Sequence, residues 1–363
     1  MKYLDRRIEK VMESISEKDI ALLITSDITR RYVYNFCSTA GFGYISSGRC
    51  ELFLDFRYYE KAKNLQQEGK ISKLVNIREI DKKRKDLIEP ILSEEKISKL
   101  IYEDRHMTCS EFCILREEFN EIEFIPAGGL IDKQRAVKDQ YELERMIKAQ
   151  EITDKAFSYI VSYIKRGMRE RDIALELEYY MRKNGADGLA FDTICVSGRK
   201  SSMPHGEPDE TVVSDGFLTL DFGARFDGYC SDMTRTLCVG KPNVEMIKIY
   251  DTVLKAQEAA FSRITGNVNG RDVDAAAREV IYSAGYQGCF GHSTGHSLGL
   301  EIHESPNFSP SEKEKVPAGA VVSVEPGIYI EGKCGVRIED VVFLTENGYK
   351  NLTNSTKEII ILK

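Results

Sequence analysis

Residues 217–240 read FLTLDFGARFDGYCSDMTRTLCVG, and this stretch decides the fold of the C-terminal part of the chain. Two runs of strand-forming residues flank Asp227-Gly228, and Asp-Gly in that setting is the strongest short signal for a β-hairpin. A two-residue turn here pairs Asp221 with Thr234 and places Asp232 two residues further along the same face. The alpha carbons of the two aspartates are then about 7–8 Å apart. Because like charges this close repel each other in a partly buried site, we expect a cation between them.

Residues 321–344, VVSVEPGIYIEGKCGVRIEDVVFL, repeat this arrangement. Two apolar runs flank a short turn, and a three-residue loop at 331–333 places Glu325 opposite Glu339. The Glu-Pro-Gly sequence predicts a β-bulge beside Glu325, since proline cannot donate to a strand ladder. The chain therefore offers two β-ribbons, each of which presents two acids on one face.

The histidines gather between the two ribbons. The chain has five histidines, and His292, His296 and His303 all lie in GHSTGHSLGLEIHESP, residues 291–306. Four carboxylates with one or more imidazoles suit a pair of Mn²⁺, Co²⁺, Fe²⁺ or Zn²⁺ ions. Two such ions, roughly 3.5–4 Å apart, recur in aminopeptidases. In this interpretation one histidine completes the metal shell, and the others handle protons and the substrate carbonyl.

Composition excludes several other classes of protein. The chain has 363 residues, 42% of them apolar and 30% charged, and a net charge of −7, which is typical of a soluble globular protein. Its basic residues are dispersed, and it has neither a signal-peptide core nor an apolar run of about 18 residues. Nine scattered cysteines, with Cys109 and Cys113 the nearest pair, favour free thiols in a reducing compartment over a zinc site. We expect a cytoplasmic protein that binds neither nucleic acid nor membranes.

The two parts of the chain differ in their pattern of apolar, charged and glycine residues. In the first third, apolar runs alternate with charged helical stretches, which favours a small α/β domain. We predict strands within 19–26, 50–57 and 99–104, helices within 58–69, 81–92 and 110–120, and a linker at 126–139. Periodicity and glycine stops predict further helices from about 140 to Gly167, and over 170–184, 243–263 and 271–284. We place the boundary so that an α/β domain covers 1–135 and an α+β domain covers 136–363.

Four other features have simple interpretations. Residues 327–334, GIYIEGKC, have the spacing of a phosphate-binding loop but end in cysteine and read as strand–turn–strand. We interpret Asp227 as a turn residue, Asp340 as solvent-exposed and His106 as structural.

Five segments resemble, in order, the signatures of the pita-bread metallopeptidases. They are VSGRKSSMPHGEPDE, LDFGARFDGYCSDMTRT, GHSTGHSLGLEIHESP, SVEPGIYI and GVRIEDVVFL, and the likeness covers most of residues 140–363. Residues 30–62 are similar to the creatinase-type N-terminal domain of the same enzymes, although family members usually carry glycine where Asn35 stands. The resemblance implies an α+β, pita-bread (creatinase/aminopeptidase-like) catalytic domain preceded by a smaller α/β creatinase-type domain.

The resemblance also implies a role for each site residue. The metal ligands would be Asp221, Asp232, His296, Glu325 and Glu339, with Asp232 and Glu339 bridging both ions. Glu325 would also be the general base. His205 and His303 would bind the substrate and stabilise the oxyanion, and His292 and Arg337 would complete the substrate pocket.

The activity that the resemblance implies is hydrolysis of the peptide bond between an N-terminal residue and proline, by a hydroxide bridging two divalent ions, foremost Mn²⁺. The residues of the motifs resemble an Xaa-Pro aminopeptidase more than a prolidase (Xaa-Pro dipeptidase), which is the alternative. A third interpretation is a non-catalytic peptide-binding member of the fold, which would normally have lost metal ligands. The resemblance implies a homodimer in which the N-terminal domain assists substrate access.

Overall fold

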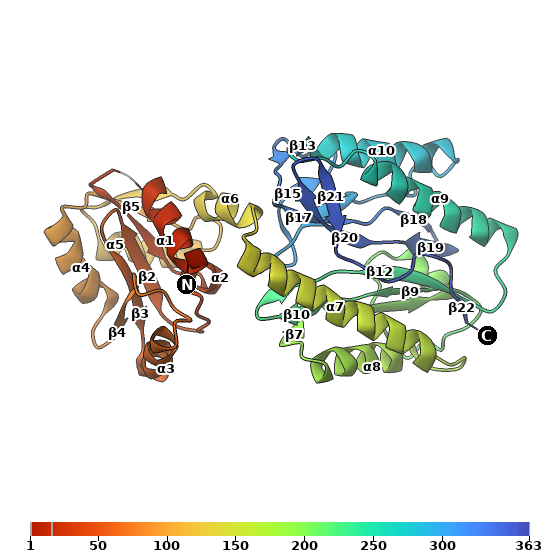
Figure 1. The fold of residues 1–363 in the computed structure, drawn as a ribbon, viewed down its shortest axis with the longest axis horizontal. Coiled ribbons are helices and arrows are strands. Elements are labelled where there is room, and N and C mark those ends of the chain that lie inside the picture. The colour runs from red at the N-terminus through yellow and green to blue at the C-terminus, as the bar shows by residue number, and fades with distance from the viewer. Residues whose placement is uncertain (1, 16, 363) are drawn as a thin grey trace. The chain divides into compact units, whose positions relative to one another are not determined.

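The structure is a computed structural model that describes residues 2–15 and 17–362. The chain divides into two compact units, Met1–Arg135 and Ala136–Lys363 (Figure 1). Among the described residues, no helix has both the length and the apolar character that crossing a membrane requires.

The first unit is built on a six-stranded mixed sheet. Its strand order is β4 (Asn76–Glu79), β3 (Cys50–Leu54), β2 (Phe42–Ser46), β1 (Ile20–Ile24), β5 (Lys99–Tyr102) and β6 (Glu123–Pro126). The helices are α1 (Lys2–Ser14), α2 (Asp27–Tyr34), α3 (Phe56–Gln67), α4 (Arg84–Glu95), α5 (Cys109–Glu118) and α6 (Leu130–Ala136). The three predicted strands and three predicted helices are confirmed with small shifts at their ends. Strands β2, β4 and β6 and helices α1 and α2 were not predicted.

Two local features of this unit differ from the sequence expectation. The predicted linker at 126–139 contains helix α6, which begins directly after two glycines with positive φ angles, Gly128 and Gly129. Asn35 ends helix α2 with φ at 55°. Glycine is the usual residue in this left-handed region and asparagine the next best tolerated, so the departure at Asn35 preserves the backbone.

The second unit consists of two halves, each a helix pair packed on a β-sheet. In the first half, α7 (Gln140–Tyr163) and α8 (Glu170–Lys183) share a core with the sheet β22 (Ile361–Leu362), β12 (Thr234–Val239), β9 (Gly216–Asp221), β8 (Ile194–Ser197). A capping box between Asp139 and Glu142 starts α7, and Gly185, at φ 104°, follows α8. Both helices were predicted.

In the second half, α9 (Val244–Phe261) and α10 (Gly270–Ser283) take the place of α7 and α8. The five-stranded sheet is β15 (Glu304–Phe308), β14 (Gly295–Ser297), β17 (Val321–Val324), β20 (Asp340–Thr345), β21 (Gly348–Asn351). The hairpin β18 (Gly327–Ile330) and β19 (Cys334–Arg337) completes the core of this half. Within this unit, Figure 1 shows the strands lying between the two helix pairs. The short elements are β7 (Gly188–Leu189), η1 (Gly198–Ser202), β10 (Ala224–Phe226), β11 (Tyr229–Cys230), β13 (Val268–Asn269) and β16 (Lys315–Val316).

The first ribbon has the predicted register. Strands β10 and β11 meet at Asp227-Gly228, whose φ angles of 46° and 82° match a type I′ turn. The same register continues into β9 and β12, so that Asp221 lies opposite Thr234. The turn therefore sets the positions of the two aspartates.

The second ribbon also has the predicted register, but the predicted bulge is wrong. Val324 pairs with Asp340 before the Glu-Pro sequence, and Gly327 pairs with Arg337 after it. Two residues, Glu325 and Pro326, thus stand opposite two residues, Ile338 and Glu339. Since neither strand has an extra residue, both ladders are interrupted without a change of register.

Candidate metal centre

A cavity of about 760 Å³ lies between the two halves of the second unit. It is lined by residues of both ribbons, by the histidine stretch and by the segment that follows η1. All nine predicted site residues contribute to its wall, namely His205, Asp221, Asp232, His292, His296, His303, Glu325, Arg337 and Glu339. His106 is exposed on the first unit.

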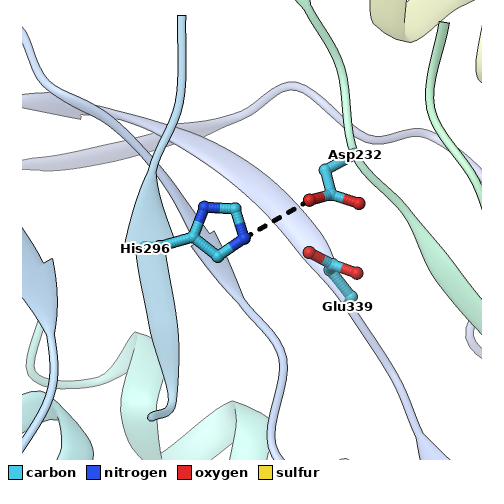
Figure 2. Close-up of side chains that lie close together, drawn as sticks. All are labelled: Asp232, His296 and Glu339. Atoms are coloured by element: carbon cyan, nitrogen blue, oxygen red, sulfur yellow. Dashed lines mark ion pairs between the residues drawn. The ribbon is translucent and has the colours of Figure 1, made fainter. Parts of the chain in front are cut away.

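Three of the predicted ligands form a tight cluster. Asp232, His296 and Glu339 each offer one ligand atom, and these atoms lie within 4.8 Å of one another. Figure 2 shows the Nε2 edge of the His296 ring directed at Asp232, with the Glu339 carboxylate beside it. His296 Nε2 is 3.4 Å from both Asp232 Oδ2 and Glu325 Oε1. The cluster draws on three separate segments of the chain.

Hydrogen bonds between the two ribbons hold these carboxylates in place. Thr234 Oγ1 donates to Glu339 Oε2 at 2.7 Å, and Glu339 N donates to the Thr234 carbonyl at 3.1 Å. In the second ribbon, Ser323 Oγ donates to Glu325 Oε1 at 3.1 Å and accepts from His296 N at 3.0 Å. Sequence reasoning missed Thr234 and Ser323, although each lies two residues from a predicted ligand.

The cluster carries more negative charge than its surroundings can balance. Burial, followed by repulsion from neighbouring carboxylates, raises the pKa of Asp232 and of Glu339 well above their ordinary values. Across residues 2–15 and 17–362, three buried oxygens in this cavity have no hydrogen-bond partner, one each on Asp221, Asp232 and Glu339. Buried acceptors are rarely left unpaired, so these oxygens are suited to bind a cation.

The orientation of His296 points the same way. Its Nδ1 lies 3.2 Å from the Ser297 carbonyl, and a carbonyl can only accept, so Nδ1 carries the proton. In the neutral imidazole that a metal ligand requires, the lone pair of Nε2 then faces the carboxylates of Asp232 and Glu325, which also have only lone pairs to offer. A divalent cation resolves this conflict, and neutral imidazole with carboxylates is a donor set that suits such ions. The residues therefore fit the expected metal.

Asp221 already has a cationic partner, Arg337. Arg337 Nη2 donates to Asp221 Oδ2 at 2.5 Å, Nε donates to Thr234 Oγ1 at 2.9 Å, and Nη1 donates to Tyr329 Oη at 2.7 Å. Burial nevertheless leaves the pKa of Asp221 raised. The predicted substrate-binding role of Arg337 is thus joined by a second one, since its donors orient Asp221 and Tyr329.

Tyr329 was not predicted, and it connects Arg337 to His292. Its hydroxyl lies 2.9 Å from His292 Nε2, while His292 Nδ1 lies 2.8 Å from the Ser293 carbonyl. Burial raises the pKa of Tyr329 to about 12 and lowers the pKa of His292. The protonated tyrosine donates to a neutral His292, whose two ring nitrogens are then both occupied. Tyr329 is four residues from Glu325 in a ribbon, which is the signal that sequence reasoning overlooked.

His303 and His205 lie at the accessible part of the cavity wall, and both are exposed. The His303 ring meets His296 edge to face, with centroids 4.5 Å apart. Burial of part of the ring, followed by the effect of His296, lowers the pKa of His303. A neutral His303 keeps one N–H available to donate to a ligand in the cavity.

Asp340 corrects the sequence interpretation. It was expected in solvent, but it is 1% exposed and accepts from Arg235 at 2.7 Å and Lys357 at 2.9 Å. Asp227 is a turn residue as expected, and its Oδ2 pairs with Arg145 Nε at 2.8 Å. The nine cysteines are all free, and residues 327–334 form the hairpin β18–β19 rather than a phosphate-binding loop.

Comparisons with known proteins bear on this geometry. A solved Xaa-Pro dipeptidase from Bacillus anthracis is 40% identical, with a TM-score of 0.93, covering 99% of this chain and 100% of that one. A solved X-Pro aminopeptidase from Thermotoga maritima is 36% identical, with a TM-score of 0.90, covering 98% and 100%. An Xaa-Pro dipeptidase from Pyrococcus furiosus is 36% identical and covers 98% of this chain and 100% of its own length.

The family matches cover nearly the whole chain. Residues 7–137 match the creatinase/prolidase N-terminal domain, and residues 144–346 match metallopeptidase family M24. They confirm the resemblance seen in the sequence and the expected α+β architecture. The chain belongs to metallopeptidase family M24.

Proposed function

We propose that this protein is a metal-dependent peptidase that hydrolyses the bond preceding proline, with Xaa-Pro dipeptides as its preferred substrates. The observation that carries the peptidase proposal is the buried cluster of Asp232, His296 and Glu339 in the wall of a large cavity. The names of the Bacillus anthracis and Pyrococcus furiosus relatives support the dipeptide preference. These names favour prolidase over the Xaa-Pro aminopeptidase that the residues of the sequence motifs suggested.

The aminopeptidase stays the second candidate because of one feature of the cavity. Recognition of a dipeptide requires a cation for its free carboxylate, usually arginine. Of the residues that line the cavity in the described part of the chain, Arg337 is the one arginine or lysine, and its donors are directed to Asp221, Thr234 and Tyr329. A longer peptide, which has no carboxylate at that position, needs no such partner. The name of the Thermotoga maritima relative agrees with this candidate.

The ligands that we propose are Asp221, Asp232, His296, Glu325 and Glu339, for two divalent ions, foremost Mn²⁺ with Co²⁺, Zn²⁺ or Fe²⁺ as alternatives. When bound, such ions acidify water and polarise the scissile carbonyl. Glu325 accepts the proton of the attacking water and returns it to the proline nitrogen as the bond breaks. This transfer is needed because the nitrogen leaves as a secondary amine.

The histidines act on the carbonyl side of the same bond. His303, neutral and with an N–H to donate, stabilises the oxygen on which negative charge develops, and His205, which also lines the cavity, assists. Arg337 and Tyr329 keep Asp221 and His292 in place.

We further propose that the protein is a cytoplasmic homodimer. The support for the compartment is that Cys37, Cys109 and Cys113 are exposed free thiols, which a reducing environment maintains. Sedimentation or light scattering of the purified protein tests the dimer, and a monomer across micromolar concentrations would overturn it.

The decisive assay of the function compares substrates in the presence of Mn²⁺. Leu-Pro is compared with Arg-Pro-Pro and with Leu-Ala, which lacks proline, and Asp232→Asn serves as the inactive control. We expect rapid cleavage of Leu-Pro, slow cleavage of Arg-Pro-Pro and none of Leu-Ala. Cleavage of the tripeptide alone would establish the aminopeptidase, and cleavage of neither peptide would refute both candidates.

A further inference from the structure

An irregular loop, residues 298–303, carries His303 to the cavity. The loop begins directly after Ser297, which is the last residue of strand β14 and follows His296. It ends before Glu304, the first residue of β15, which pairs with Ser297. Within the loop, Gly299 N donates to the Glu301 carbonyl at 2.9 Å, and from outside it Cys230 N donates to the Gly299 carbonyl at 2.7 Å. The position of His303 therefore depends on what holds this loop.

The loop is closed by the Glu304 carboxylate. Glu304 Oε1 accepts from Glu301 N at 3.2 Å. Both carboxylate oxygens press against the backbone at Gly299, where an added β-carbon would lie only 2.7 Å and 2.8 Å from them. Glu304 thus fills the space inside the turn, which explains why the chain has glycine at 299. A shift of Glu304 would move the whole loop.

A buried lysine holds Glu304 in this position. Lys138 Nζ lies 2.9 Å from Glu304 Oε2, and the two side chains are 1% and 6% exposed. The backbone of Lys138 is itself fixed, because its N–H donates to the Gly319 carbonyl at 2.9 Å and the next residue, Asp139, caps helix α7. Lys138 is not among the residues that line the cavity in the described part of the chain. It therefore acts at a distance from any ligand.

We propose that Lys138 is a positioning residue that, through Glu304, sets the place of His303 in the cavity. Two apolar residues of similar size generally serve stability as well as a buried ion pair does, so bulk stability does not account for this pair. The charges instead orient the Glu304 carboxylate, because Lys138 contacts Oε2 while Oε1 accepts the hydrogen bond from Glu301 N in the loop. The inference rests on the proposed function for the role of His303, and not for the geometry.

A double-mutant cycle tests whether Lys138 acts through His303. Lys138→Met keeps an unbranched apolar side chain, and we expect it to lower kcat/KM for Leu-Pro about 10–100-fold, the loss typical of a displaced reactive group. The same substitution in a His303→Ala background should change kcat/KM by less than about threefold, because the group that it misplaces is gone.

A matched control separates positioning from general loosening. Lys200 also pairs with a buried carboxylate, that of Glu170 at 2.8 Å, and Lys200→Met should lower kcat/KM by the same factor with or without His303. If Lys138→Met also lowers kcat/KM equally in both backgrounds, the inference is overturned while the proposed function stands.

A second readout needs no activity. The chain has five histidines, so their imidazole ¹H–¹³C signals are resolvable, and His303→Ala assigns the signal of His303. Lys138→Met should displace that signal and leave the signal of His106 unchanged. An unmoved His303 signal overturns the inference, even if the protein proves to cleave no Xaa-Pro peptide at all.

Discussion

Asp232→Asn separates two opposite effects of one carboxylate, and the structure gives their size. Ligand atoms of Asp232 and Glu339 lie within 4.8 Å of each other, and two full charges at that distance repel by about 3–4 kcal/mol at an effective dielectric constant of about 20. Burial and repulsion raise the pKa of both acids, so protonation removes part of this repulsion energy. We expect the metal-free variant to gain about 1–2 kcal/mol, or about 3–6 °C in Tm for a unit of this length.

With bound metal, the wild type becomes more stable than Asp232→Asn. Saturating Mn²⁺ at about 100 times its Kd stabilises the wild type by about 2.7 kcal/mol for each site, and Asp232→Asn should lose most of this gain. Calorimetric unfolding with chelator and then with Mn²⁺ measures both effects. Asp227→Asn, the same chemical change in the half-buried turn of the same hairpin, should shift stability by no more than about 1 kcal/mol. A variant that is less stable than the wild type in chelator, or equally stabilised by Mn²⁺, would refute the reasoning.

Three further predictions follow from the same geometry. His303→Ala should lower kcat/KM about 10²–10³-fold, the usual loss for an oxyanion donor, with bound metal unchanged; steady-state kinetics that find less than a fivefold loss would contradict its role. Asp340→Ala should lower the free energy of unfolding by about 3–5 kcal/mol, because it leaves Arg235 buried without its carboxylate, and urea unfolding that detects no change would argue against this ion pair. The pKa of Asp232 is raised in the fold, so its contribution to the stability of the metal-free protein is complete below roughly pH 4 and is lost as pH rises through the raised pKa. The increase in Tm that Mn²⁺ produces should therefore grow between pH 5 and 8. An increase in Tm that does not depend on pH would contradict the assignment of Asp232 as a ligand.

The two ribbons were predictable because short turns fix register. Asp227-Gly228 permits the backbone conformation of a type I′ turn, and from that point each residue of one strand has a determined partner in the other. This is enough to place Asp221 opposite Thr234 and to bring Asp232 to the same face. The second ribbon followed from its three-residue loop, with Gly332 at φ 67° supplying the positive angle.

Long-range partners were not predictable in the same way. Asp340 appeared exposed because alternation along a strand says nothing of Arg235 and Lys357, which reach it from other segments. Tyr329 was overlooked because an aromatic residue in a strand is ordinary, and its role emerges only from its contacts with Arg337 and His292. Side-chain partners of this kind depend on tertiary packing, on which a local sequence pattern carries little information.

The most direct test of the metal centre is a count of bound ions. Wild type and Glu339→Gln are loaded with Mn²⁺, freed of excess metal by gel filtration and analysed by mass spectrometry of the metal. The account predicts about two ions per chain in the wild type and at most one in Glu339→Gln, because this substitution removes a carboxylate proposed to bridge both ions. No bound ion in the wild type, or an unchanged count in the variant, would contradict it.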